Sequence, residues 1–331
     1  MIIMEFYSHI QAYMEEIDRK IFDKLNSEDE RIYGITAPFL KKSGKRLRPA
    51  LCLLSCGMAG GKYGSVVDIA AIIEIMHNVT LIHDDIEDKS RFRRGEPTLH
   101  TTYGTPTAIN CGDALYNFAW NWMLDLSFEP GRIIDLQKRY SKGIKRMVQG
   151  QGYEIEWTRE DNFSVSEEEY LKMISGKTAA LMEISCETGA FFADADDNLI
   201  ARFGRFGSVL GTAFQIHDDV LNVIGDFSKY KKDIGGDIFE GKRTLMVIHA
   251  IANGKENQTR RLKEILTSHS DNDEDIKEAI GILSDCGSID YARSFSKRLS
   301  EEAKEILEPF EDSKDKKSML QIADYVIERE R

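Results

Sequence analysis

Apolar residues recur every three or four positions along almost the whole chain, and this spacing constrains the fold more than any other feature of the sequence. One such series contains Ile69, Ile73 and Met76, and strand-like alternation of apolar and polar residues is hard to find. Side chains at this spacing share one face of an α-helix. Because only six prolines interrupt the chain, the pattern predicts an all-α protein of roughly ten or more helices.

Length and composition limit the number of domains. A chain of 331 residues is compatible with one large domain or with two. Its hydrophobic fraction of 42% is sufficient for a sizeable core. We expect a single domain over residues 1–331, with the functional motifs in about 35–250 and charge-rich, amphipathic peripheral helices in about 255–331.

Charge and cysteine content indicate the environment of the protein. A net charge of -12 argues against nonspecific nucleic-acid binding, because that affinity comes from Lys and Arg neutralising phosphates. The five cysteines are odd in number and form no CxxC pair, which favours a reducing compartment. Residues 1–14 do not resemble a signal peptide, and no apolar run approaches the roughly 20 residues of a spanning helix. We therefore expect a cytoplasmic protein without a transmembrane segment or a nucleic-acid partner.

A first acidic cluster consists of Asp84, Asp85 and Asp88. On a helix, Asp84 and Asp88 place their carboxylates on one face, and Asp85 lies about 100° away around the axis. A single DDxxD of this kind is more often a solvated helix end than a binding site. The interpretation therefore depends on what else the chain carries.

A second cluster, Asp218, Asp219 and Asn222, repeats this spacing after an apolar stretch. Carboxylates on two core-like helices are costly unless cations neutralise them. Ligand sets made only of oxygen favour hard ions such as Mg²⁺, which binds carboxylates together with substrate phosphates. His83 and His217 stand one position before each cluster and point about 100° away from the acidic pair, which argues against zinc.

A diphosphate site also needs cations, and short basic groups stand out in this acidic chain. Guanidinium forks suit phosphate oxygens, although any one of these residues alone would more often be a surface charge. The segment 236–242 fits GxxxxGK but is not a P-loop, because Arg243 replaces the required Ser or Thr. The basic residues are Lys45, Arg46, Arg48, Arg93, Arg94, Lys177, Lys232, Lys242 and Arg243.

Six motifs carry a resemblance to a known family. They are GKRLRP at 44–49, HNVTLIHDDIEDKSRFRRGEPTLH at 77–100, GD at 112–113, GKTA at 176–179, FQIHDDVLN at 214–222 and KDIGGDIFEGKRTL at 232–245. In this order they make the chain resemble the trans-isoprenyl diphosphate synthases, or polyprenyl synthetases. The resemblance implies an isoprenoid synthase fold, which is a single large all-α bundle around a deep central cavity, usually in a homodimer.

The resemblance also implies a role for each matching residue. Two or three Mg²⁺ ions would be bound by Asp84, Asp88 and Asp218, with Asp85 and Asp219 in support. Isopentenyl diphosphate would be held by Lys45, Arg48, His77 and Arg94. The allylic diphosphate (dimethylallyl, geranyl or farnesyl) would be held by Arg93, Lys177, Gln215, Lys232 and Lys242, with Thr178 assisting. The residues expected to be catalytic are Asp84, Asp85, Asp88, Arg93, Lys177, Asp218, Asp219 and Lys232.

The implied reaction is a head-to-tail condensation. Mg²⁺ and the basic residues would stabilise the diphosphate as it leaves the allylic carbon. The isopentenyl double bond would attack the resulting cation, and the departing diphosphate would accept the proton. An apolar cavity would exclude water from the cation.

Residues before the first cluster bear on product length. In the family that this chain resembles, a bulky aromatic residue four or five positions before the first Asp ends the cavity early. Val79 and Thr80 occupy those positions here, so the resemblance implies a product of about twenty carbons or longer. Met76, or Phe118 and Trp120, would then form a deeper floor. The alternative, that these are ordinary core residues, stays open.

Two other functions are compatible with parts of the sequence. A terpene cyclase of the same fold class would not need GKRLRP or the Arg93–Arg94 pair. A non-catalytic partner subunit would not need intact acidic clusters. Two positions depart from the family pattern, since Asn222 replaces a common Asp and Met246 replaces a frequent Pro. We expect Asn222 to weaken a metal contact and Met246 to have no effect.

Overall fold

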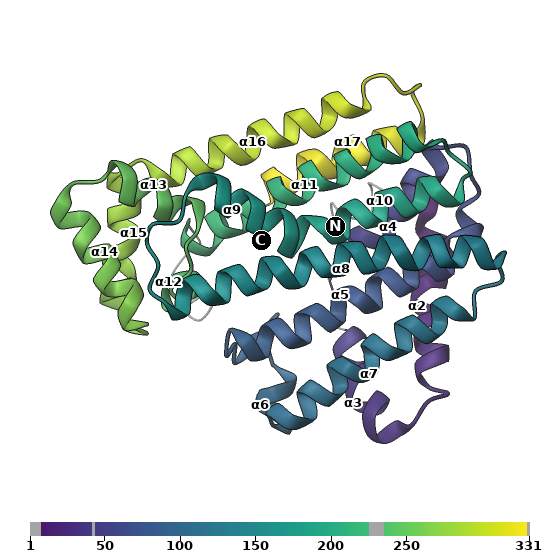
Figure 1. The fold of residues 1–331 in the computed structure, drawn as a ribbon, viewed down its shortest axis with the longest axis horizontal. Coiled ribbons are helices and arrows are strands. Elements are labelled where there is room, and N and C mark those ends of the chain that lie inside the picture. Colours follow the sequence, from purple (N-terminus) through teal and green to yellow (C-terminus); the bar gives the residue numbers. More distant parts are fainter. Residues whose placement is uncertain (1–7, 42–43, 225–234, 330–331) are drawn as a thin grey trace. The chain divides into compact units, whose positions relative to one another are not determined.

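The computed structural model describes residues 8–41, 44–224 and 235–329. These residues are almost entirely helical (Figure 1), which confirms the all-α prediction. Their single sheet pairs β1 (Phe92–Arg93) antiparallel with β2 (Glu96–Pro97). The helices are η1 (Ser8–Ile10), α2 (Gln11–Leu25), α3 (Glu30–Lys41), α4 (Leu47–Met58), η2 (Tyr63–Ser65), α5 (Val67–Glu87), α6 (Leu99–Tyr103), α7 (Thr105–Leu124), α8 (Pro130–Arg159), α9 (Glu167–Ile174), η3 (Ser175–Ala179), α10 (Ala180–Phe192), α11 (Asp197–Ile224), α12 (Gly236–Phe239), α13 (Leu245–Asn253), α14 (Glu256–Ser268), α15 (Asp273–Asp285), α16 (Ser288–Leu307) and α17 (Lys314–Glu328).

Contacts between residues divide the chain into two compact units. The first unit comprises Met1–Ser141, Ile184–Gly204 and Phe310–Met319, and the second comprises Lys142–Glu183, Arg205–Pro309 and Leu320–Arg331. Among the described residues, no helix is both long enough and apolar enough to cross a membrane.

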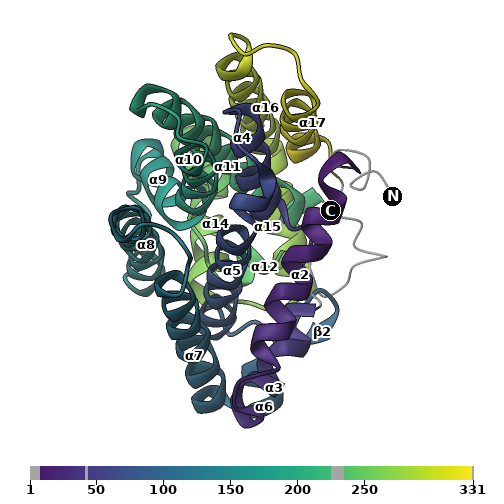
Figure 2. The same ribbon diagram turned by 90° about the vertical axis from the view of Figure 1, so that its right-hand side faces the viewer.

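Helix α5 is the central helix of the first unit. It packs against α2, α4 and α7 (Figure 2) and is buried over most of its length. A helix that is apolar on all sides is expected in the interior. Its buried Glu74 is neutralised by Arg46 at 2.6 Å and accepts a hydrogen bond from Asn78 at 3.1 Å.

Gly112 allows α7 to approach α5 closely. A Cβ atom at this position would collide with the imidazole of His83. His83 also lies 3.5 Å from Asp113, so the GD motif at 112–113 packs against the histidine that precedes the first acidic cluster. This packing fixes the end of α5 on which the cluster stands.

In the second unit, helix α9 begins with a capping box formed by Ser166 and Glu169. The α-helical hydrogen-bond pattern then changes to a π-helical turn, η3, over the GKTA motif. Apolar residues of α11, α13, α14 and α15 form the core beneath this turn, among them Ile216, Leu245 and Ile265. A π-turn inserted between α-helices often marks a functional position.

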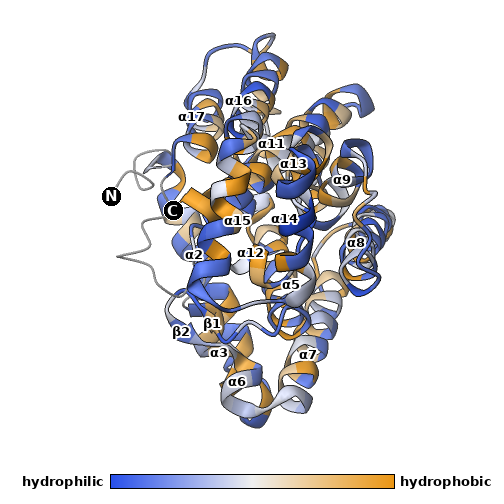
Figure 3. Ribbon diagram, turned by 90° about the vertical axis from the view of Figure 1, so that its left-hand side faces the viewer, coloured by the Kyte–Doolittle hydropathy of each residue, from blue (hydrophilic) through white to orange (hydrophobic). Residues whose placement is uncertain are grey.

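The C-terminal helices of the second unit are amphipathic, as predicted. Helix α14 is mostly hydrophilic (Figure 3) and buries one apolar stripe containing Leu262, Ile265 and Leu266. The segment 90–106 contains β1, β2 and α6. Of the segment 225–241, residues 225–234 lie outside the described chain, and α12 occupies part of the remainder.

Candidate functional site

The first acidic cluster lies at the carboxyl end of α5. Asp84 and Asp85 belong to the last turn, and Asp88 is the C-cap residue. The helix dipole is negative at this end and disfavours further negative charge. Asp85 is buried, whereas Asp84 and Asp88 are partly exposed. The cluster therefore needs a compensating positive charge.

Arg93 from β1 supplies part of that charge. Its Nε donates to Asp85 Oδ1 at 2.7 Å, and its guanidinium lies 3.5 Å from Asp84. Burial raises the pKa of Asp85 to about 6, and the interaction with Arg93 opposes this rise. The other oxygen of Asp85 is buried and has no hydrogen-bond partner among the described residues. Asp85 is thus a supporting group held by Arg93, and Asp84 and Asp88 are the more accessible carboxylates.

A basic cluster of the first unit surrounds the middle of α5. Arg48 Nη1 lies 3.2 Å from His77 Nε2. Burial, together with the neighbouring arginines, holds the pKa of His77 well below its usual range, so the neutral ring accepts this hydrogen bond. Burial also lowers the pKa of Arg48 to about 10. Arg94 lies against Gly44, the residue before Lys45. The structure thus brings Arg48 into contact with His77, and Arg94 beside the GKRLRP segment.

Arg46 has a different environment from its neighbours in GKRLRP. It pairs with buried Glu74 at 2.6 Å and with Asp18 at 2.9 Å, and its backbone is left-handed, with φ 51°. Two carboxylates already neutralise its charge. We assign Arg46 to the packing of α5 rather than to an anion.

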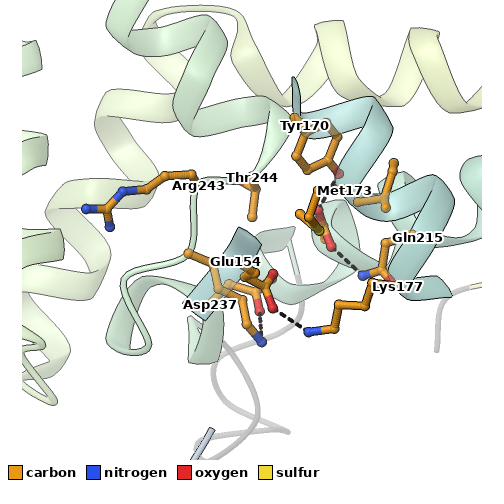
Figure 4. Close-up of a pocket in the computed structure, with 11 residues that line it drawn as sticks. Glu154, Tyr170, Met173, Lys177, Gln215, Asp237, Arg243 and Thr244 are labelled. Carbon is orange, nitrogen blue, oxygen red and sulfur yellow. Dashed lines mark hydrogen bonds and ion pairs between the residues drawn. The ribbon is translucent and has the colours of Figure 1, made fainter. Parts of the chain in front are cut away.

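The second unit contains a pocket between acidic and basic side chains (Figure 4). The pocket is formed by α8, α9, η3, α11, α12 and the segment before α13. Its lining residues are Glu154, Tyr170, Met173, Ile174, Lys177, Gln215, Asp219, Asp237, Lys242, Arg243 and Thr244. Lys177, Gln215, Asp219 and Lys242, which the sequence assigned to one site, therefore do come together.

Lys177 reaches this pocket from the π-turn and forms an ion pair with Glu154 of α8. The two helical segments touch through glycines. A Cβ atom on Gly150 would lie 2.6 Å from the Met173 carbonyl oxygen, and one on Gly176 would lie 2.6 Å from the Arg146 carbonyl oxygen. The position of the Lys177 ammonium group therefore depends on backbone contacts that exclude any side chain.

A hydrogen-bond chain holds Asp219 from both sides. Tyr170 donates to Asp219 Oδ2 at 2.7 Å, and Gln215 Nε2 donates to Oδ1 at 2.8 Å. Thr178 in turn donates to Gln215 Oε1 at 2.7 Å. Burial and the nearby Asp237 raise the pKa of Asp219 well above its usual range, and the two donors oppose that rise.

Lys242 lies between two acids, Asp237 at 3.5 Å and Glu240. Asn222 accepts a hydrogen bond from the backbone N–H of Asp237 at 3.1 Å. Asn222, which departs from the family pattern, thus contacts the first turn of α12, which carries Asp237. Lys232 lies outside the described residues.

Arg243 does not face the basic residues of the pocket. Its side chain points away from Lys177 and Gln215 (Figure 4) and stacks over Phe163, 3.9 Å from the ring centre. It also donates to the carbonyl oxygens of Asn162 and Gly241. Buried in these contacts, it fixes the segment that carries Lys242.

Asp218 differs from Asp219 in its exposure. Its side chain is 51% exposed, and its Oδ1 accepts a hydrogen bond from Arg329 at 3.0 Å. Among the described residues, no three His, Cys, Asp or Glu side chains are grouped closely enough to hold a metal ion by themselves.

Sequence reasoning missed Glu154, Tyr170, Asp237 and Arg329. Tyr170 has the spacing of an ordinary core residue, and a hydrophobic pattern does not show whether a buried hydroxyl group has a hydrogen-bond partner. Asp237 stands inside the quoted motif KDIGGDIFEGKRTL but was not singled out. Glu154 and Arg329 are single charges within charge-rich helices, so no sequence signal separated them from surface residues.

The described chain is an all-α protein whose fold matches those of solved isoprenyl diphosphate synthases. The chain belongs to the polyprenyl synthetase family, whose model matches residues 29–283. It is 37% identical to the geranylgeranyl pyrophosphate synthase of Geoglobus acetivorans over 95% of this chain and 96% of the relative.

Solved structures agree with this assignment. The geranylgeranyl pyrophosphate synthetase of Pyrococcus horikoshii Ot3 superposes with a TM-score of 0.90 at 35% identity, covering 98% of each chain. The polyprenyl synthase of Caulobacter crescentus CB15, complexed with calcium and isoprenyl diphosphate, superposes with a TM-score of 0.92 at 25% identity, covering 99% of this chain and 98% of that one.

Proposed function

We propose that the protein is a trans-prenyltransferase that condenses isopentenyl diphosphate with an allylic diphosphate, head to tail. The product is geranylgeranyl diphosphate or a longer polyprenyl diphosphate, and diphosphate is released. The observation that carries the proposal is the pocket of the second unit, where Lys177 and Lys242 stand beside Asp219 on motifs of the family. Partly buried cations among carboxylates suit a polyphosphate bound together with divalent metal ions.

The donor set fits Mg²⁺ as the metal. Asp84, Asp88 and Asp218 offer only carboxylate oxygens, and all three are at least partly exposed. Mg²⁺ is commonly bound by one or two carboxylates, with substrate phosphates and water completing its shell, so a cage of three protein ligands is not required. When bound, two or three Mg²⁺ ions would neutralise the charge that develops on the leaving diphosphate.

The basic residues divide into two groups in this proposal. Lys45, Arg48, His77 and Arg94 of the first unit hold isopentenyl diphosphate. Arg93, Lys177, Gln215, Lys232 and Lys242 hold the allylic diphosphate, with Thr178 acting through Gln215. The neutral His77 donates one ring N–H to a phosphate oxygen while its other nitrogen accepts from Arg48.

The allylic C–O bond breaks with both electrons passing to the diphosphate, which the Lys177 and Lys242 ammonium groups stabilise. The double bond of isopentenyl diphosphate then attacks the allylic carbon. A proton leaves the adduct for the departing diphosphate, and the new double bond forms. Asp85 and Asp219 act by holding Arg93, Tyr170 and Gln215 in place.

We infer that the growing tail passes along α5 below Asp84. Val79 and Met76 are buried on this helix, and Thr80 donates to the His77 carbonyl oxygen at 2.8 Å. Val79 and Thr80 are too small to stop a tail at fifteen carbons. Met76, or Phe118 and Trp120 of α7, would end it at twenty or more.

We further propose that the protein is a cytoplasmic homodimer. Ile109, Tyr116 and Leu124 are large, exposed hydrophobic residues on α7, and their spacing places them within one side of the helix. An apolar stripe of this kind suits a second copy of the chain. All five cysteines are free thiols, as in a reducing compartment. Sedimentation velocity of wild type and of Leu124→Glu tests the dimer, which the charge should weaken.

The activity is tested with purified protein, Mg²⁺ and labelled isopentenyl diphosphate. Separate reactions receive dimethylallyl, geranyl or farnesyl diphosphate, and the products are sized by chromatography. We expect elongation that EDTA abolishes. Consumption of an allylic diphosphate without isopentenyl incorporation would instead favour a cyclase, and activity only with a second subunit would favour a partner role.

Replacing Asp84 tests the metal assignment. Asp84→Ala removes a carboxylate from the first cluster, so Mg²⁺-dependent turnover should fall by at least about 100-fold. Circular dichroism should remain that of wild type, because Asp84 is partly exposed. Asp125→Ala, an exposed acid at the end of α7, is the matched control. Near-wild-type turnover of Asp84→Ala would contradict its role as a ligand.

A further inference from the structure

An arginine near the end of the chain is buried against the second acidic motif. Arg329 follows α17 directly, and its side chain is only 7% exposed. Its Nη2 donates to Asp218 Oδ1 at 3.0 Å and to the Phe214 carbonyl oxygen at 3.3 Å. The guanidinium also stacks on the Phe214 ring, 3.9 Å from its centre. A surface ion pair between long, mobile side chains would not be buried in this way.

The position of Arg329 does not depend on Asp218 alone. The Nε2 atom of His217 lies 3.1 Å from the Arg329 carbonyl oxygen. Upstream, Ile322 and Val326 of α17 are fully buried, and Ser300 of α16 donates to the Ala323 carbonyl oxygen at 2.8 Å. The helix is thus anchored within the second unit, and the arginine is held before it meets the carboxylate.

The contact leaves Asp218 available to a ligand. Arg329 uses one oxygen, while the Asp218 side chain remains 51% exposed. A carboxylate has two oxygens with about four acceptor sites, so one hydrogen bond does not saturate it. Carboxylates that bind metals are commonly oriented by a hydrogen bond of this type, and its loss typically costs about 10- to 100-fold in metal affinity or activity.

We propose that Arg329 is a positioning residue that orients the carboxylate of Asp218 for Mg²⁺. This inference rests on the proposed function, in which Asp218 is a metal ligand. The positive charge of Arg329 opposes metal binding, but the carboxylate of Asp218, 3.0 Å away, neutralises much of that charge. Orientation by a buried, stacked guanidinium is the larger effect, so removing Arg329 should weaken metal binding.

The test compares wild type with Arg329→Ala, Arg329→Gln and Arg329→Lys in the full chain. Turnover is measured against Mg²⁺ concentration, and Mn²⁺ binding is measured directly by electron paramagnetic resonance with inorganic diphosphate present. Arg329→Ala and Arg329→Gln should need about 10- to 100-fold more Mg²⁺ for half-maximal turnover and bind Mn²⁺ correspondingly less tightly. At saturating Mg²⁺ their kcat should approach that of wild type.

Arg329→Lys should recover part of the loss, because it keeps the charge but not the planar fork. Arg205→Ala, an exposed arginine of α11 that pairs with Glu302, should change neither measurement. A purely structural role would lower the thermal stability in EDTA while leaving the half-saturating Mg²⁺ concentration unchanged. Should Arg329→Ala not fold, Arg329→Gln and Arg329→Lys still give the comparison.

Unchanged Mg²⁺ and Mn²⁺ requirements in the folded variants would overturn the inference. A lower requirement would also overturn it, because Arg329 would then compete with the metal. Inactive wild type with every allylic primer would contradict the proposed function, whereas the Mn²⁺ measurement would still decide the role of Arg329.

Discussion

At the scale of single residues, the two acids of the second motif have different environments. Asp219 is buried with both oxygens occupied by Tyr170 and Gln215. Asp218 is half exposed and carries one hydrogen bond from Arg329. A carboxylate whose oxygens are already satisfied contributes shape and charge to a site, while an accessible one can bind an ion. Adjacent, chemically identical residues are thus given separate roles by their partners.

Tyr170→Phe isolates one of these partners. The change leaves Asp219 Oδ2 buried without its donor, which should cost about 1–3 kcal/mol of unfolding free energy. It also removes a bond that opposes the raised pKa of Asp219, so the carboxyl should protonate at higher pH and kcat/KM should fall most on the acidic side. Urea unfolding and a pH profile of kcat/KM measure both effects.

The control for this change is Tyr153→Phe, which keeps the stacking of Tyr153 on Trp157 of the same unit. We expect it to alter neither stability nor the pH profile appreciably. If Tyr170→Phe matched wild type in both measurements, the hydrogen bond to Asp219 would contribute neither to stability nor to the pH dependence of kcat/KM.

The sequence predicted the acidic residues but only some of the side chains that hold them. Asp84, Asp85, Asp88, Asp218 and Asp219 stand out because charge on an otherwise apolar helix is costly and demands compensation. Gln215 stands four residues before Asp219 and Arg93 eight residues after Asp85, but Tyr170 and Arg329 come from distant parts of the chain and follow no local spacing. This is why the donors Tyr170 and Arg329 emerged only from the structure.

At the scale of elements, two helical segments of the second unit meet through glycine. At Gly150 of α8 and Gly176 of η3, the backbones of the two segments are in direct contact. Periodicity predicted helices on both sides of this contact. It did not predict the π-turn over GKTA, because a single inserted residue hardly changes a pattern with a repeat of three or four.

Gly150→Ala tests this contact. The new Cβ atom would lie 2.6 Å from the Met173 carbonyl oxygen and closer still to the Lys177 backbone nitrogen. Backbone atoms cannot rotate away, so η3 must shift, and overpacking should cost about 1–3 kcal/mol of stability. Because Lys177 moves with η3, we expect kcat/KM for the allylic substrate to fall by about tenfold or more.

Gly152→Ala is a matched control on the same helix. A Cβ atom there has no neighbour within 4 Å among the described residues. An alanine in an exposed helix interior should stabilise the protein by about 0.5–1 kcal/mol and leave kcat/KM unchanged. Equal effects of the two substitutions would contradict the role assigned to the close contact.

Helix α5 offers a second test at this scale. Val79→Phe and Thr80→Phe add an aromatic ring one turn before Asp84, on the helix that we propose to line the tail. The product distribution should shift to shorter chains, measured with dimethylallyl diphosphate as the primer. Val79→Ala, which removes volume at the same position, should not shorten the product. An unchanged distribution in both aromatic variants would place these side chains away from the tail.

At the scale of the whole molecule, most boundaries between the two units do not coincide with linkers. Four of the five boundaries fall inside α8, α10, α11 and α17, so each of these helices contributes residues to both units, and only the boundary at Pro309 and Phe310 lies between helices. Independent domains are usually separated in exposed, flexible segments. The single domain expected from the sequence stays a prediction. It can be tested, because the two units of a single domain should unfold together in one cooperative transition.

Tryptophan fluorescence can follow each unit separately. Trp120 and Trp122 belong to the first unit and Trp157 to the second. Trp157→Phe leaves reporters only in the first unit, and the double variant Trp120→Phe, Trp122→Phe leaves one only in the second. For one cooperative domain, urea unfolding of the two variants should have coincident midpoints after correction for the stability of each variant.

Adding Leu53→Ala to both tryptophan variants shows whether a destabilised first unit also destabilises the second. Leu53 is fully buried in α4 of the first unit, and its truncation should cost about 2–5 kcal/mol. If the chain unfolds as one domain, the reporter in the second unit must register the same loss, measured at one protein concentration because assembly contributes to stability. A loss confined to the first-unit reporter would mean that the units unfold independently, and the helices that cross their boundaries would then fray at those crossings without transmitting the destabilisation.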